Sequence, residues 1–133
     1  MEISIEMCHA ESLLSSEIEQ INILMRELSL GAGLIQKEYL LEMNRGATII
    51  LFARLEGRII GMGSVVRIQK ISGLIALIED VVVLSEHRGK GIAEKLCRRL
   101  ISLAQVFGAH YVGLTSSPKR EAANRLYRRL GFE

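Results

Sequence analysis

The sequence lacks any apolar run of the roughly 20 residues that a membrane-spanning helix needs. Around Glu2 and Glu6, the N-terminus also lacks the basic and apolar regions of a signal peptide. These absences predict a cytoplasmic protein with no membrane partner. A chain of 133 residues can bury most of one core but has no room for a second. We therefore expect a single domain over residues 1–133.

Cysteine is scarce as well, and Cys8 and Cys97 do not have the spacing of metal ligands. Cys97 falls in a helical pattern, so we expect a buried thiol without chemistry. The histidines, His9, His87 and His110, are scattered along the chain, which argues against a zinc site. We predict no metal.

Tryptophan is absent, and only three Phe and three Tyr are present. A surface for single-stranded nucleic acid interleaves aromatic and basic side chains, because bases stack on the first and phosphates pair with the second. No such interleaving occurs here, and no repeat or low-complexity segment suggests another binding mode. The sequence argues against a nucleic-acid partner.

The net charge of +2 conceals an opposition between the two parts of the chain. Residues 1–87 carry 7 Lys/Arg against 12 Asp/Glu, whereas residues 88–133 carry 10 against 3. A basic second part suits a ligand with several phosphates, and an acidic first part could attract a cationic amine. Solvated helix faces account for most of the basic side chains without any ligand.

Hydrophobic periodicity predicts an α+β fold. The expected order is a strand at 2–7, helices at about 13–28 and 36–43, strands at 47–55, 58–69 and 74–84, a helix from 92 to about 108, a strand at 110–115 and a helix at 119–130, with a loop at 116–118.

Local signals place the ends of these elements. Ser12 or Ser15 is the expected N-cap of the first helix, and residues 31–33, Gly-Ala-Gly, are expected to end it. Glu56-Gly57 and Ser72-Gly73 predict hairpin turns. Consecutive hairpins give a mostly antiparallel twisted sheet, and the long helix gives one parallel crossover.

Residues 78–93 combine a strand, a polar glycine-rich turn and the start of a helix. The β-branched run at 81–84 favours a buried strand, and from Ile92 the apolar residues recur at the spacing of one helix face. The turn between them is the place where chemistry can occur.

Gly89 and Gly91 remove side chains from this turn, so a ligand could approach the backbone amides that a helix start leaves unpaired. Arg88 and Lys90 add positive charge. The pattern indicates an anion site suited to a pyrophosphate. Glycine-rich turns also serve packing alone, and these residues by themselves leave that alternative open.

Two nucleotide-binding patterns are excluded. A P-loop ends in Gly-Lys-Ser/Thr, and the dinucleotide fingerprint needs a third glycine where Ala93 or Glu94 stands. Neither condition is met.

Two motifs instead resemble the GNAT family of N-acetyltransferases. Arg88, Gly91 and Ala93 match the family's acetyl-CoA loop, Arg/Gln-x-x-Gly-x-Gly/Ala. Residues 124–132 look like its closing segment, Asn-x-x-Tyr-x-x-x-Gly-Phe. The resemblance covers residues 78–132 by motif and the first half by element order. It implies a GNAT-like acyltransferase fold in which residues 1–77 form mainly the acceptor side and residues 78–133 the acetyl-CoA side.

The resemblance implies transfer of acetyl from acetyl-CoA to a primary amine, with both substrates bound in a ternary complex. Backbone groups at the end of the strand would pair with the pantetheine arm, loop amides would hold the pyrophosphate, and Asn124 would steady the arm. The positions implied at acetyl-CoA are Val81, Val82, Val83, Arg88, Gly89, Lys90, Gly91, Ile92, Ala93, Asn124 and Tyr127.

Tyr127 is the candidate catalytic acid. A phenol with a pKa near about 10 can return a proton to a thiolate whose conjugate thiol has a pKa near about 8.5. A packing tyrosine on the last helix is the alternative.

Glu79 is the candidate catalytic base. Strict alternation along the strand places Asp80 on the opposite face, so only one of the two carboxylates is expected to face the acceptor. Residues 78–80 look like the strand entry of glucosamine-phosphate acetyltransferases of the family. A salt bridge or an edge charge is the alternative for both carboxylates, and a water molecule could replace them as base.

Two classes of function remain: an active N-acetyltransferase for a small-molecule or peptide amine, and a catalytically silent module that binds CoA. A silent relative would be expected to lack the acid, and Tyr127 is present. The first half shows no signature of a particular acceptor.

The sequence ends at Glu133, directly after Gly131-Phe132, where the family continues with further strands. We therefore expect truncated C-terminal strands and an open edge on the strand at 110–115. Because identical edges can satisfy each other's backbone groups by symmetry, this edge predicts a homodimer. An edge that stays exposed, with some loss of stability, is the alternative.

Overall fold

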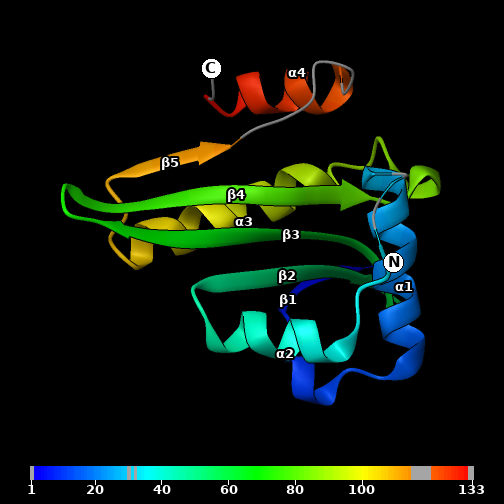
Figure 1. Ribbon diagram of the computed structural model, residues 1–133. Helices are drawn as coiled ribbons and strands as arrows, with labels where there is room; N and C mark the ends of the chain where they lie inside the picture. Colours follow the sequence, from blue (N-terminus) through cyan, green and yellow to red (C-terminus); the bar gives the residue numbers. More distant parts are fainter. Residues whose placement is uncertain (1, 30, 32, 115–120, 132–133) are drawn as a thin grey trace.

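The computed structural model describes residues 2–29, 31, 33–114 and 121–131 (Figure 1). Its elements follow the predicted order, and two short 3-10 turns are added. They are β1 (Ile3–Met7), η1 (Ala10–Ser12), α1 (Ser15–Leu28), α2 (Lys37–Arg45), β2 (Thr48–Leu55), β3 (Arg58–Lys70), β4 (Gly73–Val83), η2 (Ser85–His87), α3 (Ile92–Val106), β5 (Tyr111–Leu114) and α4 (Glu121–Arg129). The predicted α+β class is confirmed, and the loop expected at 116–118 lies outside the described residues.

The strands form one sheet in the order β1-β2-β3-β4-β5. All neighbouring pairs are antiparallel except β4 and β5, which are parallel. At the turn between β2 and β3, Glu56 and Gly57 both have positive φ, at 52° and 81°. Positive φ at both central residues is typical of a type I′ hairpin turn, whose twist matches that of the strands.

Helix α3 covers one face of the sheet and packs closely against β3. A Cβ atom added to Gly61 would lie 3.4 Å from Cδ1 of Leu96, and one added to Gly63 would lie 3.1 Å from Cδ1 of Leu100. Alternate residues of β3, such as Ser64, therefore face the opposite layer. In Figure 1, α3 runs behind the strands, and α1 and α2 lie on the viewer's side.

The core lies between these layers. Its largest fully buried side chains are Phe52, Leu24, Ile59, Ile60, Ile78, Ile92, Leu96, Leu100, Val65 and Cys97. Cys97 is buried, as the sequence predicts, and so is Cys8. Burial raises the pKa of the Cys8 thiol to about 11. A thiol with such a pKa stays protonated at neutral pH and is a poor nucleophile. In the part of the chain that the structure describes, no helix is both long and apolar enough to cross a bilayer.

Helix α1 has a different N-cap from the one that the sequence predicts. Leu14 occupies the N-cap, so the assignment to Ser12 or Ser15 is wrong. The backbone N–H of Leu14 donates to Oε1 of Glu17 at 2.8 Å, and Arg54 pairs with the other oxygen of Glu17 at 2.6 Å. The Leu14 N–H and then Arg54 hold the pKa of Glu17 below its ordinary value. At the other end the helix stops at Leu28, ahead of the glycines at 31–33.

Candidate active site

The described pairing between β4 and β5 covers only the first part of β4. The parallel ladder joins Ile75–Ile78 to Tyr111–Leu114, and β4 continues from there to Val83. Its other edge stays paired with β3, since the N–H of Leu84 donates to the oxygen of Ile60 at 2.9 Å. Among the described residues, the last part of β4 therefore pairs only with β3.

A bulge in β4 begins where this ladder ends. Ser64 pairs with Glu79 and Met62 with Val82, so Asp80 and Val81 together oppose a single residue of β3. Asp80 has a φ of 56°. Such a left-handed residue in a bulge breaks the alternation of side chains, and the argument that places Asp80 on the face opposite Glu79 therefore does not apply here.

Burial affects both carboxyl groups at this bulge, those of Glu79 and Asp80. Burial, and then the charge of Asp80, raises the pKa of Glu79. Although Asp80 is exposed as a whole residue, loss of water around its carboxyl raises its pKa too. Because Glu79 pairs with Ser64, it lies on the face of the sheet away from α3. The hydroxyl of Ser64 donates to the backbone oxygen of Glu79 at 3.1 Å and helps hold the strand there.

The turn between β4 and α3 has the geometry that its two glycines permit. Gly89 and Gly91 both have a φ of 79°, and Gly91 is the N-cap of α3. A Cβ atom added to either would meet nothing within 4 Å, so it would project into open space. The amides of the first helical turn have no partner within the helix. The open space beside these glycines and the amides of the first helical turn would suit the phosphates of a CoA.

A cleft of about 780 Å³ joins this turn to the end of β4 and to α4. The residues lining it are Glu27, Leu28, Val81, Val82, Val83, His87, Arg88, Gly89, Gly91, Ile92, Ala93, Glu94, Ala123, Arg125, Leu126, Tyr127 and Arg129. Most predicted acetyl-CoA positions are therefore found in one place.

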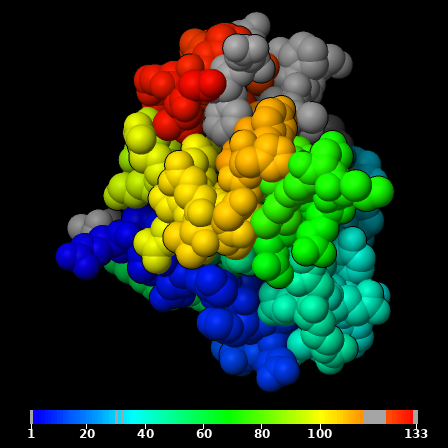
Figure 2. All heavy atoms as spheres, turned by 90° about the vertical axis from the view of Figure 1, so that its left-hand side faces the viewer, coloured from blue at the N-terminus to red at the C-terminus, as the bar shows by residue number. Residues whose placement is uncertain are grey.

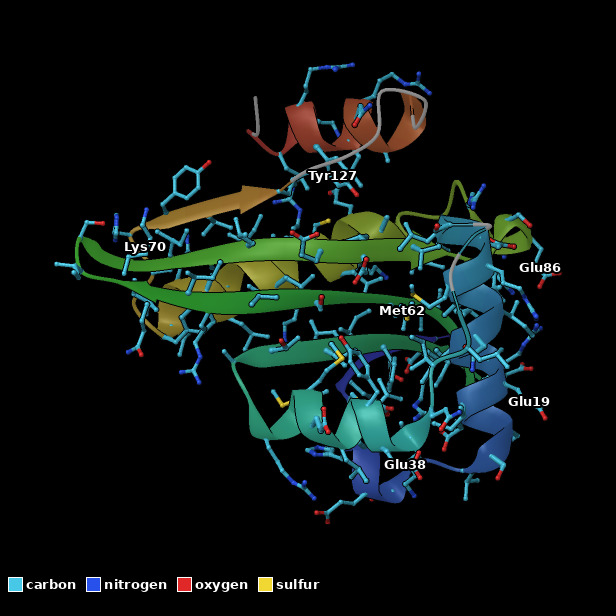
Figure 3. All side chains as sticks on the ribbon, viewed as in Figure 1. Glu19, Glu38, Met62, Lys70, Glu86 and Tyr127 are labelled. Carbon is cyan, nitrogen blue, oxygen red and sulfur yellow. The ribbon has the colours of Figure 1, made fainter. Side chains whose placement is uncertain are left out.

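Tyr127 brings a phenol into this cleft from α4. Its side chain is 6% exposed, and Figure 3 shows it on the side of α4 that faces the sheet. An ion pair ties α4 to the start of α3, with Arg129 on Oε1 of Glu94, while Arg98 binds Oε2 at 3.1 Å. Arg129 and then Arg98 hold the pKa of Glu94 below its ordinary value.

Three predicted site residues do not line the cleft. Asn124 is half-buried on α4, and Glu79 lies at the bulge. Lys90 is exposed, with Nζ 3.2 Å from Nδ1 of His87. The site residues as a set stay predictions.

Glu27 is a cleft residue that the sequence does not signal. It approaches Arg88 from α1, with Nη2 of Arg88 3.2 Å from Oε2 of Glu27. Nε of Arg88 donates to the backbone oxygen of Val83 at 3.2 Å. Local sequence rules cannot find a contact between residues 61 positions apart.

Among the described residues, no group of three or more His, Cys, Asp and Glu side chains could hold a metal ion.

A family comparison agrees with the fold. The model of the acetyltransferase (GNAT) family matches residues 17–132. The chain belongs to the GNAT family. The resemblance seen in residues 78–132 is thereby confirmed, and the match extends it through the first half.

Solved structures of other GNAT acetyltransferases share the fold. An acetyltransferase from Trypanosoma brucei is 24% identical, with a TM-score of 0.82 and coverage of 99% of this chain and 93% of that one. The glucosamine-6-phosphate N-acetyltransferase of Arabidopsis thaliana is 23% identical, with a TM-score of 0.83 and coverage of 100% and 92%. An aminoglycoside N-acetyltransferase solved with CoA is 19% identical, with a TM-score of 0.79 and coverage of 99% and 88%. A search among curated proteins gives no match.

Proposed function

We propose that this GNAT protein is an acetyl-CoA-dependent N-acetyltransferase that transfers acetyl directly to a primary amine while both substrates are bound. One observation carries the proposal. The cleft brings together the glycine turn before α3, the end of β4 and the buried Tyr127. These features serve the phosphates, the thioester and the leaving thiolate of a single acyl-CoA.

The turn between β4 and α3 supplies the anchor for acetyl-CoA. Amides from Arg88 to Ala93 would donate to the pyrophosphate, aided by the positive end of α3. Gly89 and Gly91 leave the space that phosphate oxygens would fill. Backbone groups of Val81–Val83 would pair with the pantetheine arm and polarise the thioester carbonyl, with Asn124 steadying the arm.

The transfer needs one base and one acid. Glu79, or a water it binds, takes a proton from the ammonium of the acceptor, and the amine nitrogen attacks the thioester carbon. The C–N bond forms, the C–S bond breaks, and the thiolate takes a proton from Tyr127. The Tyr127 oxygen then regains a proton from the acetylated nitrogen, which becomes a neutral amide. The products are an N-acetyl amine and CoA. No covalent bond to the protein is required.

The acceptor in this proposal is a small-molecule amine. Two of the similar structures are, by their names, enzymes for glucosamine 6-phosphate and for aminoglycosides, and both substrates carry amino groups on sugar rings. The paired carboxyls of Glu79 and Asp80 would favour a cationic group beside the thioester. A peptide amine is the other candidate acceptor.

Release of free CoA thiol tests the proposal. Purified protein and acetyl-CoA are incubated with a panel of amino sugars, aminoglycosides, polyamines and peptides, and thiol release is followed with and without each amine. We expect release that depends on at least one amine, with mass spectrometry showing a single added acetyl group. Binding of CoA without acetylation of any amine would favour the silent CoA-binding module, and absence of CoA binding would reject both functions.

A further inference from the structure

A carboxylate stands at the edge of the turn that is proposed to bind phosphates. Glu27 lies near the C-terminal end of α1 and lines the cleft. In Figure 1 this end of α1 lies beside η2. A carboxylate repels phosphate, so its presence here calls for a reason other than contact with the ligand.

The contacts of Glu27 supply that reason. Oε2 accepts the backbone N–H of Ser85 at 3.0 Å, and Oε1 accepts the Ser85 hydroxyl at 3.2 Å. Nη2 of Arg88 donates to Oε2 at 3.2 Å. One carboxylate therefore holds both the first residue of η2 and the residue that follows η2. Hydrogen bonds to an ionised group are stronger than those between neutral groups.

Arg88 extends this connection to the strand. Its Nε donates to the backbone oxygen of Val83, so α1, the end of β4 and the turn are joined through one guanidinium. The next residue is Gly89, where the left-handed part of the turn begins. The direction of the amides that follow depends on where Arg88 is held.

We propose that Glu27 is a positioning residue for the phosphate-binding turn. It fixes Ser85 and Arg88 so that the amides after Arg88 face the cleft, and its charge is balanced by the guanidinium it holds. The inference rests on the proposed function, because it assigns a role within the same acetyl-CoA site. It also means that α1, an element of the acceptor side, helps to build the acetyl-CoA side.

The substitution Glu27→Gln separates positioning from charge because the two effects have opposite signs. Glutamine keeps the shape of the side chain but removes a negative charge from the mouth of an anion site. If Glu27 acted by charge alone, CoA would bind more tightly. If Glu27 positions the turn, CoA binds more weakly, because the amide has one acceptor where the carboxylate has two and its NH₂ group cannot accept from Arg88.

Calorimetric titration with CoA gives the first measurement. We expect Glu27→Gln to raise the Kd for CoA by about 10- to 100-fold, the range for loss of hydrogen bonds to a charged group. Glu19→Gln is the matched control, since it removes the same charge from the same helix and Figure 3 shows Glu19 directed away from the protein. It should leave the Kd unchanged. An unchanged or lower Kd in Glu27→Gln overturns the inference.

A comparison of two acetyl donors gives the second measurement. Acetyl-CoA carries the pyrophosphate, and S-acetylpantetheine does not. Glu27→Gln should raise KM for acetyl-CoA with little change in kcat, and it should leave kcat/KM for S-acetylpantetheine unchanged. A general structural defect would lower kcat/KM for both donors, and that result overturns the positioning role.

Ser85→Ala keeps the inference testable if Glu27→Gln does not fold. It removes only the hydroxyl donor and should weaken CoA binding in the same direction by a smaller factor. An unchanged Kd in a folded Ser85→Ala variant, with Glu27→Gln unfolded, overturns the inference. Failure of the unmodified protein to bind CoA would instead reject the proposed function. The two failures are thus distinguishable.

Discussion

Tyr127 is the residue on which the proposed chemistry depends most directly. Its phenol is almost fully buried in the cleft, where a departing thiolate would need a proton. We expect Tyr127→Phe to lower kcat by about 10²- to 10⁴-fold, the range for a positioned general acid, and to leave the Kd for CoA nearly unchanged. Steady-state kinetics and calorimetry measure the two quantities.

Tyr111→Phe is the control for this substitution. Tyr111 lies on β5 and is 57% exposed, so loss of its hydroxyl should change neither quantity. A Tyr127→Phe variant with unaltered kcat would show that Tyr127 only packs α4 onto the protein.

The carboxyls of Glu79 and Asp80 should be visible in the pH dependence of the reaction. A base must be ionised to act, and a raised pKa moves its ionisation to higher pH. The apparent pKa of the acid limb in the kcat/KM profile should therefore lie above the ordinary pKa of a glutamate, about 4.3. Asp80→Asn removes a charge that raises the pKa of Glu79, so it should shift this limb to lower pH.

Glu79→Gln completes the experiment. It should abolish the acid limb and lower the rate by about 10²- to 10⁴-fold. If Asp80→Asn abolishes the limb and Glu79→Gln does not, Asp80 is the base. If the limb survives both substitutions, it belongs to another titrating group, and neither carboxyl is the base.

Among the elements, the turn between β4 and α3 is the most constrained by its sequence. Gly91→Val adds a branched side chain at a φ of 79° and fills the space beside the loop amides. We expect the thermal stabilisation that CoA gives to the protein to disappear, because phosphates can no longer approach. Thermal unfolding with and without CoA measures the effect.

Gly57→Val is the control that separates backbone strain from blocked access of phosphate to the loop amides. Gly57 has a φ of 81° and open space around it, but it lies in the turn between β2 and β3, outside the residues lining the cleft. Both variants should lose stability from left-handed strain of about 1–2 kcal/mol per residue. Gly57→Val should retain the rise in unfolding temperature that CoA gives. A full rise in unfolding temperature with CoA in Gly91→Val would mean that the turn between β4 and α3 does not bind phosphate.

The sequence predicts these elements well where the signal is local. Periodicity finds the strands and helices, and the Gly89 and Gly91 pattern finds the turn. The N-cap of α1 is missed because Leu14 has no polar side chain and Glu17 is held by Arg54 from a distant strand. The bulge at Asp80 is missed because it reflects the pairing of two strands, which alternation along one strand cannot show.

At the scale of the whole molecule, the two charged parts of the chain are not separate sites. Glu27 and Leu28 come from the acidic first part and line the cleft built mainly by the second. In the proposed acetyl-CoA site, the expected division into an acceptor side at 1–77 and an acetyl-CoA side at 78–133 would therefore not be strict. Such contacts between distant segments depend on the packing of α1 against β3 and β4, which no local pattern reports.

The edge of the sheet at β5 is where two copies of the chain could associate. Among the described residues, β5 pairs with β4 alone, and Figure 2 shows β5 at the surface between α3 and the hairpin of β3 and β4. An edge strand with exposed backbone groups is a template for pairing with a second strand. Two copies meeting at β5 would satisfy each other's groups through a two-fold axis. We therefore expect a dimer through this edge.

Sedimentation at about 50 μM, well above typical dimer dissociation constants, measures the association. Tyr111→Lys places a charge on the edge in each copy and should convert the dimer to a monomer, because like charges at a paired edge repel. Tyr39→Lys makes the same change on α2 at a similarly exposed tyrosine and should leave the dimer intact. A dimer that survives Tyr111→Lys must use another surface. A monomer in the unmodified protein would rule out the dimer and leave β5 as an exposed edge.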